Sequence, residues 1–561
     1  MKKKLGLILT CFAMLACILL LASCGKIVFT EHDYGSWIEG TEASCNDFGT
    51  VGHYCCSCHD KYFDKNKKEI SSIAIEDGEY GPHEFIDDTC KNCGYRFIAS
   101  KGLAFTLSDD ESYYILTGIG NCSDTNIIIP PVYENLPVEE IKPSAFRRNS
   151  SITSVKISSS VLTIGESAFA DCEKLKSVTF DDGSLLETVE ASAFEYCRNM
   201  TNFAFPESVT TIGDYALRSC SSLAVINVPE YVDSIGYEAF LDCAALTAIE
   251  VSENNETYKD IDGVLYTKDG ETLLQYATGK TVVNFVIPDG VKTIGASAFE
   301  NSHGLKIVVI PNSTRKIEAR AFDNCQGLVS VTLGTNVQTI GDYAFEFCPK
   351  LENIVIPNSV FEIGYRAFDN CTGLTEMKIP YSVTKIGDYA FSLCTGLKSI
   401  TVEKDNPNYK DIDGNLYTKD GKQLIQYATG KTASSFAIPE GVTDICRWVF
   451  SGCESLTSVT IPSGVTIIGD YAFENCLALT SIVIPEGVTR IGDYSFSDCK
   501  ALTTITLPKS FESFGNYAML GCKALKTIRY RGSKNDWSAV IKGYEWDSET
   551  GAYKLSYNYA G

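Results

Sequence analysis

A unit of 23 residues recurs along most of the chain, and no other feature constrains the fold as strongly. From Ile461 one copy runs directly into the next, in IPSGVTIIGDYAFENCLALTSIVIPEGVTRIGDYSFSDC. A period of this length is typical of a solenoid, in which each coil buries its apolar side only against its neighbours. The chain has 561 residues, of which 44% are hydrophobic, so its composition is that of a folded protein.

A column of cysteines allows the units to be counted. Neighbouring members of the column lie 23 residues apart within each of three runs, except for one step of 25 between Cys172 and Cys197. Asn149 and Ser302 occupy the same position, which gives fourteen units and argues for buried thiols rather than obligatory disulfides. The cysteines of the column are Cys172, Cys197, Cys220, Cys243, Cys325, Cys348, Cys371, Cys394, Cys453, Cys476, Cys499 and Cys522.

Each position of the unit has a structural interpretation. Leu479, Ile482 and Ile484 suit a short strand with its apolar side inward, and Pro485 ends that strand because proline has no N–H to donate. We expect the pair Ala472-Phe473 to fill the back of the coil from a short helical turn. The pattern therefore predicts one short β-strand and one short helical turn per unit.

Two inserts interrupt the array. The steps from Cys243 to Ser302 and from Cys394 to Cys453 are 59 residues, one unit plus 36, which places the inserts near 252–287 and 403–438. They match each other at an offset of 151, as YKDIDGVLYTKDGETLLQYATGKT and YKDIDGNLYTKDGKQLIQYATGKT. Asp-Gly pairs at 269–270 and 420–421 predict a β-hairpin in each insert. A calcium loop is disfavoured because the third acidic ligand and the closing Glu are missing. The inserts depart from the repeated surface, so we expect any specific ligand of the solenoid there.

The 23-residue unit resembles the BspA-type leucine-rich repeats of bacterial surface proteins, over roughly residues 100–540. LAFTLSDDESYYILTGIGNCSDTNIIIP from Leu103 resembles the family's N-terminal cap, and IRYRGSKNDWSAV from Ile528 resembles its C-terminal cap. The resemblance implies a leucine-rich-repeat solenoid over 143–530, a cap over 99–142, and a cap and tail over 531–561. It also implies a surface-exposed binding role, often adhesion to host or matrix proteins or to other cells.

The N-terminus has the pattern of an export signal. Three lysines at 2–4 precede an apolar run that ends in Leu21-Ala22-Ser23-Cys24, which resembles the bacterial lipobox. This resemblance implies a signal peptide over 1–23 and a diacylglyceryl thioether on Cys24, which would anchor the chain to a bacterial membrane, outside the cytoplasm and at the cell surface. A transmembrane anchor and an ordinary secretory signal are the alternatives.

Histidine and cysteine cluster in the next segment, 24–98. Cys55-x2-Cys58 and Cys90-x2-Cys93 have the spacing with which two thiolates bind one tetrahedral zinc ion. The segment resembles short zinc-ribbon-like modules of bacterial surface proteins, which implies a structural zinc cofactor. The implied ligands are His32, Cys45, Cys55 and Cys58 for one site, and His83, Cys90 and Cys93, completed by His53 or His59, for a second. One site made from both Cys-x2-Cys pairs, or disulfides, would also fit an extracytoplasmic segment.

Charge and motif content bear on function. The net charge of −23 repels phosphate backbones and anionic lipid heads, so nucleic acid is not an expected partner. His303 is the last histidine of the chain, and no Gly-x-Ser-x-Gly, Walker or His-Glu-x-x-His motif occurs. The aspartates of the recurring IGDYAF belong to every coil, so we expect no enzyme. The expected outward strand residues are Thr179, Asn227, Glu250, Thr332, Lys378, Thr401, Thr460 and Thr506.

The sequence therefore predicts a lipid-anchored, surface-displayed binding protein, an adhesin or interaction scaffold. Its expected partners are proteins or glycans of the host or of neighbouring cells. A structural envelope or cell–cell spacer without a specific ligand is the first alternative, and a surface hydrolase is the second.

Overall fold

The computed structural model describes residues 99–559, together with the backbone of six short strands nearer the N-terminus. These strands are β1 (Tyr34–Ile38), β2 (His53–Cys56), β3 (Tyr62–Phe63), β4 (Glu69–Ile70), β5 (Phe85–Ile86) and β6 (Thr89–Cys90). Strands β1 to β4 form an antiparallel sheet in chain order, and β5 pairs with β6. Among the residues described, no helix is long and apolar enough to cross a membrane.

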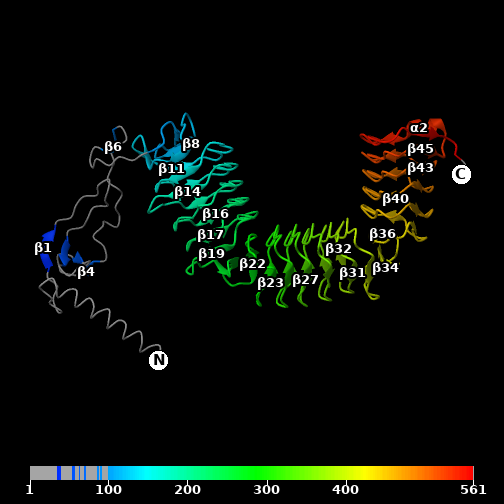
Figure 1. The fold of residues 1–561 in the computed structure, drawn as a ribbon, viewed down its shortest axis with the longest axis horizontal. Helices are drawn as coiled ribbons and strands as arrows, with labels where there is room; N and C mark the ends of the chain where they lie inside the picture. The colour runs from blue at the N-terminus through cyan, green and yellow to red at the C-terminus, as the bar shows by residue number, and fades with distance from the viewer. Residues whose placement is uncertain are drawn as a thin grey trace, which may run out of the picture.

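From β7 onward the chain winds as a solenoid in which each regular coil contributes two parallel strands (Figure 1). The first strand follows the conserved-spacing Leu and has up to four residues, and these strands make the long-strand ladder. The second has two residues, ends at the Ile before the repeated Gly, and builds the short-strand ladder. In both, neighbouring strands pair in register, as in Val155 with Val178 and Ile164 with Val189.

The long-strand ladder consists of β9 (Asn126–Ile128), β12 (Ser154–Ile157), β14 (Ser177–Phe180), β17 (Val225–Val228), β19 (Ala248–Val251), β23 (Asn284–Val286), β25 (Ile307–Val309), β27 (Ser330–Thr332), β29 (Asn353–Ile354), β31 (Glu376–Ile379), β33 (Ser399–Val402), β37 (Ser435–Ala437), β39 (Ser458–Thr460), β41 (Ser481–Val483), β43 (Thr504–Leu507), β45 (Thr527–Tyr530) and β47 (Lys554–Ser556). The short-strand ladder consists of β13 (Thr163–Ile164), β15 (Thr188–Val189), β16 (Thr211–Ile212), β18 (Ser234–Ile235), β24 (Thr293–Ile294), β26 (Lys316–Ile317), β28 (Thr339–Ile340), β30 (Glu362–Ile363), β32 (Lys385–Ile386), β38 (Asp444–Ile445), β40 (Ile467–Ile468), β42 (Arg490–Ile491), β44 (Ser513–Phe514) and β46 (Ile541–Lys542).

The leucine-rich-repeat solenoid is confirmed, but the expected content of each unit is wrong in two respects. The Thr-Ile pair before the Gly forms a second strand that the sequence did not predict. The Ala-Phe segment is not a helical turn, because its N–H groups alternate between bonds within the coil and bonds to the next coil. Phe322 N, for example, donates to the carbonyl of Ala344 at 2.8 Å. Tyr494 and Asp498 have φ of 53° and 54°, which no right-handed helix accommodates.

The count of fourteen coils is too low, because the solenoid has about 19 turns at this spacing. Caps and inserts continue the ladders: β11 pairs with β13 at one end, and β44 pairs with β46 at the other. Within the array, the insert strand β22 pairs with β24. These turns lack the cysteine column, and for that reason counting cysteines misses them.

Phenylalanine and cysteine columns form the interior. In successive coils Phe299, Phe322 and Phe345 stack with centroids 4.7 and 5.0 Å apart and planes within 8°. The Cys371 thiol donates to the carbonyl oxygen of Phe345 in the preceding coil at 3.0 Å, and the pattern recurs along the column. All twelve column cysteines are buried and free, so the expectation of buried thiols is confirmed.

Each insert folds as an antiparallel unit docked on the solenoid, which confirms the predicted hairpins. In the first insert β20 (Tyr258–Ile261) pairs with β21 (Val264–Thr267), and β21 pairs across the Asp269-Gly270 turn with β22 (Thr272–Gln275). The second insert repeats this arrangement with β34 (Tyr409–Ile412), β35 (Asn415–Thr418) and β36 (Gln423–Gln426).

The inserts bend the solenoid. On the turn side, residues 59 apart meet directly, as regular coils do at 23: Ser297 Oγ donates to Glu238 at 3.1 Å, and the Tyr389 and Trp448 rings lie 5.8 Å apart. The strand side meanwhile accommodates an additional hairpin. More chain on one side than on the other makes each insert a wedge, and Figure 1 shows the axis turning at both inserts.

The two ends of the solenoid are closed by irregular elements. At the start, β7 (Ala104–Leu107) pairs antiparallel with β8 (Tyr114–Gly118), and β10 (Val132–Tyr133) pairs with β11 (Leu136–Ile141). At the end, α2 (Lys534–Ala539) starts with a capping box between Ser533 and Asp536. Its Trp537 is 8% exposed and lies 5.3 Å from the Tyr530 ring. It thereby shields the last coil from solvent.

Candidate functional site

The sequence-predicted lipid and metal residues fall outside the part of the chain whose side chains are described. Cys24, His32, Cys45, Cys58, His83 and Cys93 lie outside the described residues, whereas Cys55 and Cys90 belong to the backbone strands β2 and β6. Lipidation and zinc binding therefore stay predictions. Within residues 99–559 no group of three or more His, Cys, Asp or Glu side chains could hold a metal ion.

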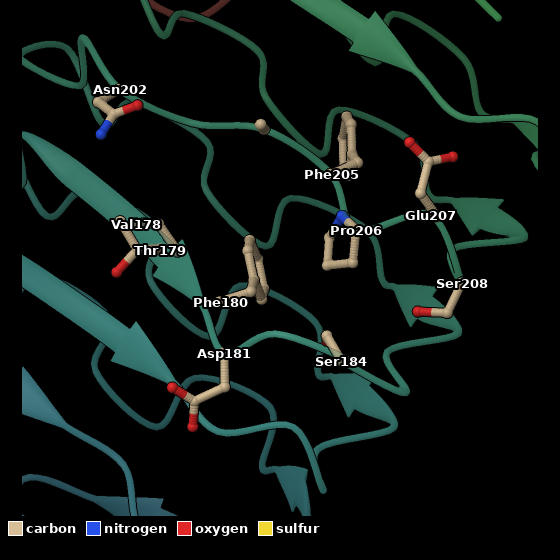
Figure 2. Close-up of a pocket in the computed structure, with 12 residues that line it drawn as sticks. Val178, Thr179, Phe180, Asp181, Ser184, Asn202, Phe205, Pro206, Glu207 and Ser208 are labelled. Atoms are coloured by element: carbon tan, nitrogen blue, oxygen red, sulfur yellow. The ribbon is translucent and has the colours of Figure 1, made fainter. Parts of the chain in front are cut away.

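A cleft opens where one coil departs from the 23-residue period. The step of 25 residues between Cys172 and Cys197 adds two residues, and the loop 181–184 accommodates them after β14. The next coil forms no strand there and touches the ladder through a single bridge, between Ser177 and Asn202. The resulting cleft has a volume of about 530 Å³ (Figure 2), within the size range of small-molecule sites.

Phenylalanines form the floor of this cleft. Phe180 and Phe205 stand at the position just before the proline slot, which Ile157 and Val228 fill in the adjacent coils. Phe203 lies behind them, with centroids 6.1 Å from Phe180 and 4.8 Å from Phe205 in edge-on contacts. Phe205 is 6% exposed, and Phe180 is only half-buried. The floor is thus apolar and presents part of an aromatic ring to solvent.

Polar groups surround that floor. Figure 2 shows Asp181, Asn202 and Glu207 around the two rings, with Ser208 at the outer edge. Lys156 lies 2.6 Å from the Asp181 carboxylate, which fixes that side chain at the rim. Asn202 and Glu207 are exposed. Acceptors and an amide therefore converge over an apolar surface.

Sequence reasoning missed this cleft, although two signals pointed to it. One is the step of 25 residues. The other is Phe at positions 180 and 205, where other coils have Val, Ile or Leu. Neither signal shows that the ladder breaks, because that depends on how one coil stacks on the next.

Comparison with known proteins identifies the repeat. The family model described as the BspA type leucine rich repeat region matches six copies, at residues 139–261, 277–419 and 427–539. The chain belongs to the BspA-type leucine-rich-repeat family.

Solved structures with similarity to this BspA-type chain are leucine-rich-repeat proteins. A leucine rich cell surface protein from Faecalibacterium prausnitzii is 26% identical, covering 79% of this chain and 97% of its own, with a TM-score of 0.37. A leucine-rich repeat protein from Bacteroides ovatus is 25% identical, covering 82% and 100%, with a TM-score of 0.40. One from Eubacterium ventriosum is 24% identical, covering 75% and 93%, with a TM-score of 0.35. No curated protein matches the chain.

The repeated aspartate of the BspA-type unit has a structural role. Asp342 Oδ1 accepts a hydrogen bond from the backbone N–H of Tyr365 in the next coil at 2.7 Å, and Asp214 does the same for Tyr237. In the third block Asp470 accepts from the N–H of Asp493 at 2.9 Å. These carboxylates satisfy backbone donors between coils, which is why they recur in each coil.

A column of acids within the second block is the most perturbed group of the BspA-type solenoid. Glu300, Asp323, Glu346 and Asp369 directly follow the repeated Phe in four successive coils. Asp323, Glu346 and Asp369 are 5%, 5% and 4% exposed. Arg320 lies 3.0 Å from Asp323, and Arg366 lies 3.5 Å from both Glu346 and Asp369.

The physical cause of the perturbation is burial. Burial, together with repulsion from Glu300 and Glu346, raises the pKa of Asp323 to about 7. Burial likewise raises the pKa of Asp369 to about 7, although Arg366 opposes the change. Perturbed carboxyls often mark active sites. These, however, are enclosed between stacked coils where no substrate reaches them, so they serve packing.

The inserts of the BspA-type solenoid keep their polar residues for structural reasons. Asn255 Nδ2 donates to the carbonyls of Pro229 and Val232 at 2.8 Å, and Asn406 makes the same two bonds in the second insert. Asp260 accepts from the N–H groups of Val251 and Gly263. The likeness of the inserts is therefore explained by the docking of rigid hairpins, without invoking a ligand.

The outward strand residues stand as expected, with one exception. Thr179, Asn227, Glu250, Thr332, Lys378, Thr401 and Thr460 are exposed. The expectation is wrong for Thr506, which is 3% exposed. Thr506 pairs with Arg529 in β45, and the guanidinium of Arg529 lies 4.8 Å from the Tyr559 ring centroid. The final segment of the chain folds back at this coil, which removes the face from solvent.

Proposed function

We propose that this protein is a lipid-anchored, surface-displayed binding protein that acts as an adhesin or interaction scaffold. The cleft between β14 and residues 202–208 carries the proposal. It combines an apolar aromatic floor with a polar rim, at the point where the regular wall of the solenoid is interrupted. Proteins or glycans of host or neighbouring cells are the proposed partners.

Membership of the BspA-type family supports this proposal. A relative is described as a cell surface protein, and we extend that placement to this chain. A long solenoid offers a large rigid surface, and its ordering cost is met on folding rather than on binding. The enclosed position of the acid column supports a non-enzymatic role.

Binding by the full chain in detergent micelles tests the proposal. The chain is immobilised and exposed to matrix proteins, to partner cells and to a panel of glycans. Saturable binding of at least one class is the expected result. Absence of saturable binding to all three would favour the spacer alternative, and turnover of a glycan or peptide would favour the hydrolase.

We also propose the lipid anchor at Cys24 and structural zinc held by His32, Cys45, Cys55, Cys58, His83, Cys90 and Cys93. A Cys24→Ala variant is expected to lose acylation and to leave the membrane fraction; continued processing and membrane retention would contradict the anchor. Zinc bound to the purified full chain with its N-terminal thiols unpaired is the expected result for the metal. Metal-free chain with paired cysteines would contradict it.

A further inference from the structure

We propose that the cleft between β14 and residues 202–208 binds a carbohydrate. A sugar ring would lie against Phe180 and Phe205, and its hydroxyls would reach Asp181, Asn202 and Glu207. This inference rests on the proposed binding function and names the class of ligand at that site.

The floor fits the apolar face of a sugar ring. In other coils the position before the proline is filled by aliphatic residues buried in the core, such as Ile157 and Ile379, both 0% exposed. Phe180 occupies the same position but remains half-buried, because the neighbouring coil does not close over it. The face of an aromatic ring carries negative partial charge and attracts the slightly positive C–H groups of a pyranose. A flat, partly open aromatic surface therefore matches this ligand.

The rim fits sugar hydroxyls. Each hydroxyl donates one hydrogen bond and accepts up to two, so it can pair with both carboxylates and amides. Glu207 and Asp181 supply acceptors, and the Asn202 amide supplies donors as well as an acceptor. Lys156, 2.6 Å from Asp181, already balances one of the two charges.

A protein side chain fits less well. An apolar side chain would desolvate Asp181 and Glu207 without returning hydrogen bonds, which is unfavourable. A cationic side chain would meet Asp181 already paired with Lys156. A neutral sugar satisfies the rim and the floor together.

Binding of the full chain to a printed array of neutral oligosaccharides tests this inference. Phe180→Leu/Phe205→Leu restores the aliphatic residue that other coils carry, so the fold is kept while the rings are lost. Glu207→Gln removes the rim acceptor. Glu230→Gln is its matched control, because Glu230 follows Pro229 one coil later as Glu207 follows Pro206. Val355→Ala, at a site 77% exposed on the regular sheet, controls for loss of apolar surface.

The expected result is saturable glycan binding that weakens at least about tenfold in the Leu double variant and in Glu207→Gln, and is unchanged in both controls. Glycan binding insensitive to these changes would overturn the inference. So would saturable binding to proteins or cationic peptides alone, which leaves the proposed function intact. Absence of binding to any glycan, protein or cell would overturn the proposed function itself.

Discussion

The acid column makes the stability of the second block depend on pH, and Asp369 offers the clearest test. Its carboxyl has a pKa of about 7 in the fold because of burial, against 3.8 for the exposed group. A tenfold change in proton affinity corresponds to ~1.4 kcal/mol, so holding Asp369 ionised at pH 8 destabilises the fold by roughly 4 kcal/mol. That figure is an upper bound, because a neighbouring carboxyl can take the proton instead.

The sign follows from proton binding. Between pH 3.8 and about 7 the folded state holds a proton on Asp369 that the unfolded chain releases. Stability therefore rises as the pH falls through 7 and is lost again as the pH increases. Asp369→Asn mimics the protonated form at every pH. We expect it to stabilise the block by roughly 2 to 4 kcal/mol at pH 8 and by about half as much at pH 5.5.

Native-state hydrogen exchange measures this effect coil by coil, which suits a repeat protein better than a single unfolding curve. Amides of residues 316–394 are followed at pH 5.5 and pH 8, with the intrinsic exchange rates divided out. Asp289→Asn, in an exposed turn of the same block, is the control and should change stability by less than about 0.5 kcal/mol. A variant Asp369→Asn that is less protected at pH 8, or that keeps the pH dependence of the parent, would refute the reasoning.

Three further predictions concern the interior and the inserts. Burial raises the pKa of the Cys172 and Cys243 thiols to about 12, so both should resist iodoacetamide at pH 8 until the chain is denatured; mass spectrometry showing native alkylation would contradict this. Tyr276→Phe removes a buried hydroxyl that has no hydrogen-bond partner, and we expect a gain of about 1 kcal/mol in urea unfolding, whereas a loss would indicate a hidden partner. Deleting residues 403–438 joins Val402 to Pro439 in the regular pattern of the unit. That variant should fold and lose one bend, seen as a larger radius of gyration per residue in X-ray scattering; an unchanged shape would show that the insert is not the wedge.

Features that repeat with the 23-residue unit could be predicted from the sequence. The strand after Leu479, the buried thiols and the hairpin at Asp269-Gly270 depend on residues close together in the chain, and the same pattern recurs in each coil. The periodic apolar positions leave a stacked solenoid as the way to bury them, which is why the family resemblance and the structure agree.

Features that depend on how one coil sits on another were decided only by the tertiary structure. The second strand of each coil is two residues long, too short for a pattern of its own, and exists because its neighbours pair with it. The tight turns replace helix because Phe322 N finds its acceptor in the next coil. The raised pKa of Asp369 arises from acids 23 and more residues away.

The cleft shows the division most clearly. The sequence contained the two extra residues after Cys172 and the phenylalanines at 180 and 205. Whether two residues are absorbed in a loop or break a ladder is settled by the stacking of coils, where each strand needs a partner in register for its hydrogen bonds. Here the loop 181–184 displaced the next coil, one strand was lost, and the aromatic floor was left open.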